Sequence, residues 1–154
     1  MKKILVPVDG SAPSIYASRE ALVFARQFGC EVLFLNVVDD RTLMANSETY
    51  FHMNKEYYEM LESVQKMEIR EATSMLDDIV KKLNCEGIIT KQEVLVGDTV
   101  RTIINKVRED GYDLIVMGHR GMNPIQRIFL GSVAKRVIEY SPCSVLISRK
   151  RDLA

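Results

Sequence analysis

The chain has 154 residues, of which 21 are Lys or Arg and 21 are Asp or Glu, so its formal net charge at pH 7 is zero. This length is typical of one domain spanning residues 1–154, and the charge balance gives no field that would attract nucleic acid. No apolar run reaches the roughly 20 residues that a membrane span needs, so we expect no membrane span and a cytoplasmic protein.

Five short apolar runs rich in Val, Ile and Leu predict β-strands. In chain order they cover residues 4–8, 32–38, 88–96, 113–117 and 144–148. Most of these runs are continuously apolar, whereas a half-exposed strand would alternate polar and apolar residues. Continuous runs are typical of a parallel sheet that is covered on both faces.

Helical spacing of apolar residues predicts four helices between these strands. The first covers residues 13–28, the second has an apolar face over 69–83, the third carries its apolar face over 100–107, and the last covers 133–140. Ser11 is the expected N-cap of the first helix and Asp98 that of the third. Gly29 and Gly111 are expected to end these two helices.

Residues 39–60 carry mixed polarity and several aromatic side chains without a clean period. We interpret them as a long loop that runs into the second helix and serves as a lid or a partner surface. An ordinary helix is the equally weighted alternative.

Alternating strands and helices predict an α/β fold with an open, doubly wound, five-stranded parallel sheet and helices on both faces. Ligands of such sheets lie outside the carboxyl ends of the strands, where the strand order changes direction. This rule puts residues 7–10 and 118–132 at the functional edge.

Cysteine and histidine give no sign of a metal site. Cys30, Cys85 and Cys143 are widely spaced and form no C-x-x-C pair, so we expect reduced, mostly buried thiols. His52 and His119 are too few and too far apart to suggest zinc unless acidic residues join them.

The passage "GHRGMNPIQRIFLGSV" follows the apolar run "DLIVM" and contains Gly118, Gly121 and Gly131. Glycine lets backbone N–H groups approach an anion, and the helix expected after Gly131 adds free N–H groups. The passage contains neither the G-x-x-x-x-G-K-[ST] motif nor G-x-G-x-x-G, so the two commonest nucleotide fingerprints are absent. The residues alone therefore leave a turn and a polyphosphate site as alternatives.

The spacing of these glycines after "DLIVMG" closely resembles the ATP-binding branch of the universal stress protein family. "KKILVPVDGS" at the start, "FLNVVD" in the second strand and "CSVLISR" in the last strand resemble the same family over nearly the whole chain. The resemblance implies a Rossmann-like fold of the adenine nucleotide alpha-hydrolase type, ATP as ligand with Mg or Mn through the phosphates, and a homodimer that pairs the last strand, 144–148.

The same resemblance implies roles for individual positions. They are Pro7, Val8, Asp9, Val37, Met117, Gly118, His119, Arg120, Gly121, Gly131, Ser132 and Val133. Residues 7–9 match the first-strand signature beside adenine, ribose or a phosphate-bound metal, which Asp9 would ligate. Val37 matches a position that contacts the adenine base, and residues 117–118 match the strand exit beside the ribose. Gly121 matches the phosphate turn, and residues 131–133 match the helix start that holds the phosphates.

Each of these roles has a structural alternative. Asp9 suits a solvated turn, Val37 suits plain core, and Ser132 suits an N-cap. His119 stands where the family usually has a small serine, and we expect it to face solvent or serve the structure, with stacking on the nucleotide or donation to a phosphate as alternatives. Arg120 and Arg127 could supply charge to phosphates, or simply be solvated.

The resemblance favours an ATP-dependent regulator or switch that hydrolyses ATP slowly at most, with no catalytic residue identified and an unidentified protein partner. The alternatives are a dedicated metal-dependent ATPase or phosphotransferase, and a nucleotide-independent interaction protein. Efficient phosphoryl transfer would need a positioned base and a clamp of charge around the γ-phosphate.

Overall fold

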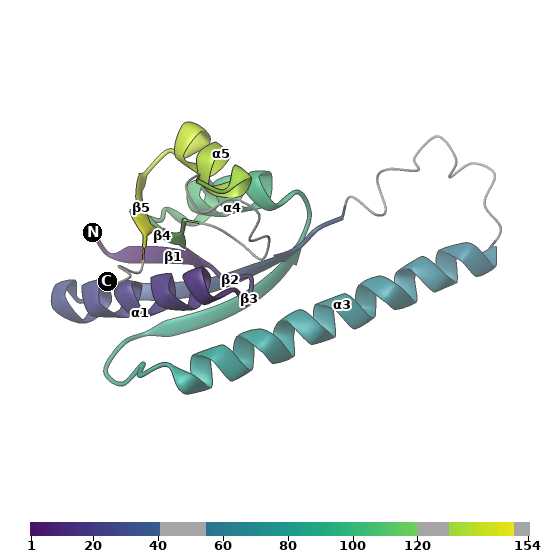
Figure 1. The fold of residues 1–154 in the computed structure, drawn as a ribbon, viewed down its shortest axis with the longest axis horizontal. Helices are drawn as coiled ribbons and strands as arrows, with labels where there is room; N and C mark the ends of the chain where they lie inside the picture. The colour runs from purple at the N-terminus through teal and green to yellow at the C-terminus, as the bar shows by residue number, and fades with distance from the viewer. Residues whose placement is uncertain (41–54, 120–129, 150–154) are drawn as a thin grey trace, which may run out of the picture.

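The computed structural model describes residues 1–40, 55–119 and 130–149, which form a five-stranded sheet in the order β3-β2-β1-β4-β5 (Figure 1). The strands are β1 (Lys3–Pro7), β2 (Glu31–Val38), β3 (Thr90–Val96), β4 (Leu114–Gly118) and β5 (Ser144–Ser148). Every neighbouring pair is parallel. The predicted doubly wound parallel sheet is confirmed, with strand ends that differ from the predicted ones by at most two residues.

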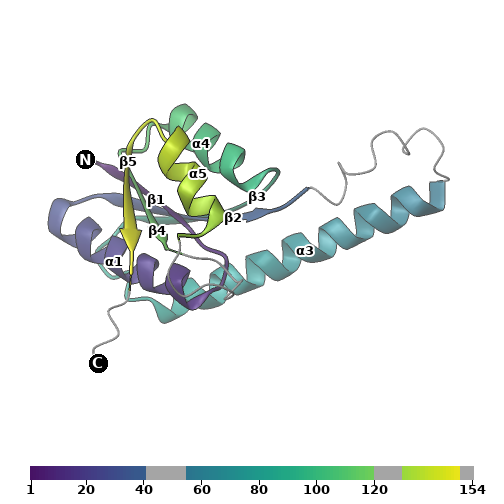
Figure 2. The same cartoon turned by 45° about the horizontal axis from the view of Figure 1, so that its top comes forward.

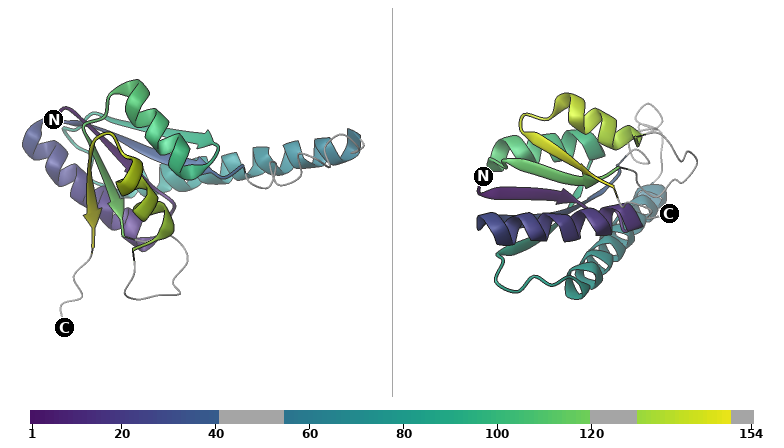
Figure 3. Two further views of the ribbon diagram at one scale, coloured as in Figure 1. Left: turned by 90° about the horizontal axis from the view of Figure 1, so that it is seen from above. Right: turned by 60° about the vertical axis from the view of Figure 1, so that its left-hand side comes forward.

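Helices cover both faces of this sheet. They are α1 (Ala12–Phe28), α3 (Lys55–Lys82), α4 (Thr99–Asp110) and α5 (Ser132–Tyr140). Figure 3 shows α1 and α3 on one face and α4 and α5 on the other. None of the described helices combines the length and the apolar character that a bilayer span requires.

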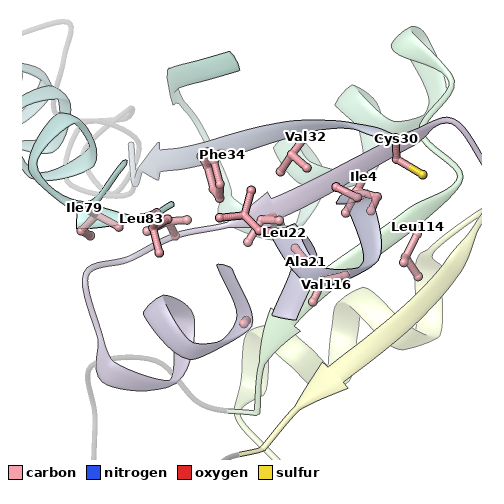
Figure 4. Close-up of a cluster of buried hydrophobic side chains, with 14 of the residues drawn as sticks. Ile4, Ala21, Leu22, Cys30, Val32, Phe34, Ile79, Leu83, Leu114 and Val116 are labelled. Atoms are coloured by element: carbon pink, nitrogen blue, oxygen red, sulfur yellow. The ribbon is translucent and has the colours of Figure 1, made fainter. Parts of the chain in front are cut away.

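Two apolar layers, one on each face, explain why the strands are continuously apolar. In β1, Ile4 and Val6 belong to the layer under α1 and α3, whereas Leu5 belongs to the layer under α4 and α5. Figure 4 shows the first layer, where Phe34 of β2 and Val116 of β4 lie among side chains of α1 and α3. Burial of these side chains on both faces supplies most of the driving force for folding.

The helix ends follow the predicted capping residues. Ser11 Oγ accepts a hydrogen bond from Ser14 N at 3.3 Å, and Asp98 Oδ1 accepts one from Arg101 N at 2.9 Å. Gly29 and Gly111 end their helices in the left-handed conformation, with φ of 65° and 69°. Short-range sequence signals therefore determine where α1 and α4 begin and end.

The second helix is longer than its apolar face predicted. α3 begins at Lys55, so the end of the 39–60 stretch is helical, while residues 41–54 lie outside the described part of the chain. Its C-terminal part packs on the sheet, and its N-terminal part extends beyond the sheet in every view (Figures 1 and 2). An i,i+4 pair between Glu62 and Lys66 at 2.9 Å gives this extension local support.

Candidate functional site

The strand order changes direction between β1 and β4, at the centre of the sheet. The chain moves outward from β1 to β2 and β3, then crosses to β4 and β5 on the other side. β1 and β4 are in register only at Ile4 with Leu114 and Leu5 with Ile115, whereas the register of β1 with β2 continues to Pro7. The carboxyl ends of β1 and β4 therefore diverge at the point where such folds bind ligands.

The turn after β1 is closed by its own side chains. Asp9 Oδ1 accepts hydrogen bonds from Ser11 N at 3.0 Å and from Ser11 Oγ at 2.5 Å, while Asp9 itself is exposed. This geometry is an Asx turn that leads directly into α1. Asp9 therefore has the turn role that the sequence offered as an alternative. Because Asp9 is exposed, its second carboxylate oxygen is open to solvent beside the diverging strands.

The backbone of Val8 is bound to β2. Val8 N donates to Leu35 O at 2.8 Å, and Val8 O accepts from Asn36 Nδ2 at 2.7 Å. The Val8 side chain is buried in the layer under α1 and α3. Asn36, which is also buried, was missed by the sequence reasoning, although a polar residue inside the apolar run 32–38 was a signal for it.

Gly118, at the end of β4, is required by packing. A Cβ atom at this position would lie 2.7 Å from the carbonyl carbon of Pro13 and 2.8 Å from its Cβ. The first turn of α1 thus sits directly against the backbone of β4. This contact accounts for one of the three glycines without a ligand, and the sequence analysis, which considered a turn and a polyphosphate site, did not foresee it.

His119 joins the two ends of the long connection between β4 and α5. Its N–H donates to Ser148 O at 3.2 Å, and its carbonyl oxygen accepts from Gly131 N at 2.8 Å. The structure therefore brings residues 117–119 and 131–133 together, although they lie more than ten positions apart in the sequence. Arg120, Gly121 and Arg127 lie outside the described residues.

Within the described residues, the N-terminus of α5 has no side-chain cap. Gly131 occupies the cap position with φ of −62° and ψ of 152°, and it has no side chain that could accept a hydrogen bond from the first turn. This is extended backbone that any residue adopts, so left-handed geometry does not explain the glycine. Ser132 is the first helical residue and is exposed, so it is not the N-cap that the sequence suggested as its alternative role.

Three further predicted residues belong to the layer under α4 and α5. Met117 is buried there, and Val37 and Val133 are half-buried at its border. Val37 lies on β2 beyond the residue that pairs with Pro7, which puts it at the same carboxyl edge. The apolar border of this layer and the start of α5 therefore lie on one face of the sheet.

Asp9 is the carboxylate that follows β1 at this edge, whereas Asp39 and Asp40 follow β2 and Asp98 caps α4. Within residues 1–40, 55–119 and 130–149, no three His, Cys, Asp or Glu side chains form a group that could hold a metal ion. Mg²⁺ usually keeps several waters and takes one or two carboxylates together with substrate phosphates. Asp9 alone therefore fits a metal that arrives with phosphates.

A separate ionic cluster joins the outer strand β3 to α4. Lys106 Nζ lies 2.6 Å from Glu93 Oε2 and 2.8 Å from Asp110 Oδ2. Burial raises the pKa of the neighbouring Tyr112 to about 12. These groups pair with one another across β3 and α4, so they support the fold.

Comparison with known proteins gives a match over the whole length. The sequence profile of the Universal stress protein family matches residues 1–149. Universal stress protein MJ0531 of Methanocaldococcus jannaschii is 35% identical over 150 residues, which cover 97% of this chain and 82% of that protein.

Solved structures have the same fold. Protein MJ0577 of Methanocaldococcus jannaschii has a TM-score of 0.82 at 28% identity, with 98% of this chain and 97% of that chain covered. A universal stress protein solved in complex with cAMP has a TM-score of 0.64 at 21% identity, covering 96% of each chain. One from Archaeoglobus fulgidus solved in complex with dAMP has a TM-score of 0.67 at 22% identity, covering 97% of this chain and 98% of that one.

Proposed function

This chain belongs to the universal stress protein family, and we propose that it binds ATP between the carboxyl ends of β1 and β4 and acts as a nucleotide-dependent regulator. The observation that carries the proposal is the bare N-terminus of α5 at the point where the strand order reverses. Free N–H groups and the helix dipole together bind phosphate.

Different residues around this helix start would contact different parts of the nucleotide. Gly131 and Ser132 would hold the phosphates, with Arg120 and Gly121 of the connecting segment beside them. Val37 and Val133 offer an apolar border for the adenine base, while Pro7, Met117 and Gly118 line the diverging strand ends around the ribose.

The residues that follow these strand ends contribute polar groups. Asp9 would ligate the Mg²⁺ or Mn²⁺ that arrives with the phosphates, through the oxygen that does not bind Ser11. The backbone of Val8 fixes the position of Asp9 by its two bonds to β2. The backbone carbonyl of residue 119 accepts a hydrogen bond from Gly131 N and so positions the helix start.

Two relatives with this fold, described above, were solved with an adenine nucleotide, one with cAMP and one with dAMP. The direct test here is mass spectrometry of the small molecules released when freshly purified protein is denatured. We expect ATP or another adenine nucleotide. Protein that carries none, and that gives no heat when ATP and MgCl₂ are titrated into it, would contradict the proposal.

Variants of Asp9 separate its structural role from its binding role. Asp9→Asn keeps an oxygen that accepts from Ser11 but removes the charge, whereas Asp9→Ala removes both. We expect both variants to weaken Mg²⁺-dependent ATP binding, and only Asp9→Ala to lower the melting temperature as well. If Asp9→Asn binds ATP and Mg²⁺ as well as the unmodified chain does, Asp9 serves only the turn.

Slow hydrolysis at most is the expected chemistry, because no three His, Cys, Asp or Glu side chains in the described ranges gather into a group that could hold the metal clamp of an efficient phosphoryl-transfer enzyme. Phosphate release in the steady state, with and without Mg²⁺ or Mn²⁺, measures this. Fast turnover that disappears in Asp9→Ala would instead make the chain a dedicated ATPase.

We further propose that residues 1–154 form a single domain that acts as a cytoplasmic homodimer through β5. β5 reads "SVLIS" and is an outer strand without a charged residue, whereas the other outer strand, β3, carries Lys91 and Glu93. An uncharged edge invites pairing with a second copy, and charges discourage it. Light scattering should give the mass of a dimer. Val145→Pro removes a backbone N–H donor from β5 and should shift the measured mass toward that of the monomer.

A further inference from the structure

The part of α3 that extends beyond the sheet carries exposed apolar side chains on one side. Met60, Val64 and Met67 are exposed by 53%, 38% and 53%. Their spacing of four and three residues puts them in one row along the helix. Large apolar side chains gathered on a projecting helix are typical of a contact surface for another molecule.

The same row continues into a groove. Glu71, Ser74 and Asp78 follow Met67 with the same spacing of three and four residues, and they line a groove of about 470 Å³. Gly10 and Ile15 form its other side. We call the row Met60, Val64, Met67, Glu71, Ser74 and Asp78 the α3 row.

The α3 row is acidic where it is not apolar. Between Leu61 and Ile79, α3 carries five carboxylates, at positions 62, 68, 71, 77 and 78, against two basic residues, Lys66 and Arg70. Two of these carboxylates, Glu71 and Asp78, line the groove, and Lys82 lies at its far end. The surface therefore offers apolar anchor points at one end and negative charge at the other.

We propose that the α3 row is a docking site for a basic amphipathic helix of a partner protein. The apolar stripe of such a helix would lie on Met60, Val64 and Met67, and its Lys or Arg residues would reach Glu71 and Asp78. Unbranched methionine side chains adapt to differently shaped partners, as helix-binding surfaces require. From Met60 to Asp78 the row rises by eighteen steps of 1.5 Å, or about 27 Å, which matches a partner helix of about five turns.

The test uses a fluorescent 18-residue peptide of Leu and Lys in an amphipathic helical pattern, with a Leu and Glu peptide of the same pattern as its counterpart. Anisotropy titrations contain no nucleotide, so their outcome does not depend on the ATP proposal. We expect saturable binding of the basic peptide, weaker binding at high salt, and at least tenfold weaker binding of the acidic peptide.

Variants locate the site. Met60→Ser with Met67→Ser should weaken binding of the basic peptide at least tenfold, and Glu71→Gln with Asp78→Asn should weaken it severalfold and reduce its salt dependence. The matched control is Val23→Ser with Phe28→Ser, because these α1 side chains are exposed by 59% and 54% but lie outside the α3 row. That control should bind the peptide unchanged.

Three outcomes would overturn the proposal. The first is equal binding by all variants, and the second is a preference for the acidic peptide. The third is a change in the chain's own mass in light scattering when Met60 and Met67 are replaced, because the α3 row would then contact a second copy. Circular dichroism melts check that each variant remains folded, as expected for exposed positions.

Discussion

Helices α4 and α5 pack side by side on one face of the sheet and begin at its same edge, yet their first turns are built in opposite ways. α4 begins with Asp98, whose carboxylate accepts a hydrogen bond from Arg101 N at 2.9 Å. α5 begins with Gly131, which has no side chain to accept one. One helix start has its own anion, whereas the described residues give the other no side-chain cap, and the proposed function assigns its N–H groups to phosphate.

α1 shows that a cap is the rule at this edge. Ser11 Oγ accepts from Ser14 N, and Asp9 fixes Ser11 in turn. A side-chain cap adds about 0.5–2 kcal/mol to stability, so its absence at α5 costs stability unless a ligand takes its place. Under the proposed function, the start of α4 serves the fold and the start of α5 serves a ligand, and substitutions can test that distinction.

The largest effect is expected when α5 is given the cap that α4 has. In Gly131→Asp, the carboxylate would accept from the first-turn N–H groups and repel a triphosphate. Hydrogen bonds to charged groups contribute about 1.5–3 kcal/mol each, so losing two should weaken ATP binding roughly 100-fold or more. The melting temperature should not fall, because φ of −62° suits an aspartate. Calorimetric titration and a thermal melt measure the two effects.

The control for this change is Gly131→Asn, which caps the helix without a charge and should weaken ATP binding less. Gly131→Val, which blocks the approach of phosphate without capping, should also bind ATP weakly. If folded Gly131→Asp binds ATP with unchanged affinity, α5 is not part of the ATP site, and the starts of α4 and α5 do not differ in function.

The next effect concerns the capped start of α1. Ser11→Ala removes the cap and the hydrogen bond from the Ser11 hydroxyl to Asp9, so we expect the free energy of unfolding to fall by about 2 kcal/mol. The backbone bond from position 11 to Asp9 remains, so ATP affinity should fall severalfold at most. Urea denaturation gives the stability change. Stability equal to that of the unmodified chain would mean that the cap of α1 is dispensable.

A smaller effect is expected at α4. Asp98→Ala should lower stability by about 1 kcal/mol and leave ATP affinity unchanged, because Asp98 caps its own helix and its ion pair with Arg136 of α5, at 3.9 Å, is exposed and weak. Asp98→Asn, which still accepts a hydrogen bond, should restore most of that loss. Weaker ATP binding by Asp98→Ala would show that the two neighbouring helix starts are not independent.

The smallest effect is expected for Ser132→Ala. Ser132 is exposed and caps nothing, so stability should stay within about 0.5 kcal/mol. Loss of one hydroxyl bond to a phosphate should weaken ATP binding by about 0.5–1.5 kcal/mol. If Ser132→Ala binds ATP with full affinity, only backbone groups of the α5 start bind the phosphates.

Much of the fold was predictable because its determinants are close in sequence. Continuous apolar runs predicted all five strands, and Ser11, Asp98 and two glycines predicted the ends of α1 and α4. The start of α3 at Lys55 was not predictable from its apolar face, because the part of the helix outside the sheet needs no such face.

The candidate site was predictable only in outline. The two segments at the carboxyl edge, 7–10 and 118–132, could be selected from the alternation of strands and helices, and the structure brings 117–119 to 131–133. The reason for Gly118 could not be found this way, because its partner Pro13 lies over a hundred positions earlier. The bond of Asn36 to Val8 O likewise depends on how β1 and β2 are aligned, which one strand alone does not reveal.

The central place of β1 has a consequence for the protein while it is still being made. β1, β2 and β3 are neighbours in the sheet and leave the ribosome first, whereas β4, which completes the other side of β1, ends at residue 118. At roughly 5–20 residues per second, the nascent chain carries an unfinished sheet for about 1–4 s after residue 96 is added. During that interval Ile4 and Leu5 lack the strand that covers them, so we expect chaperones to bind chains stalled between β3 and β4 more than finished ones.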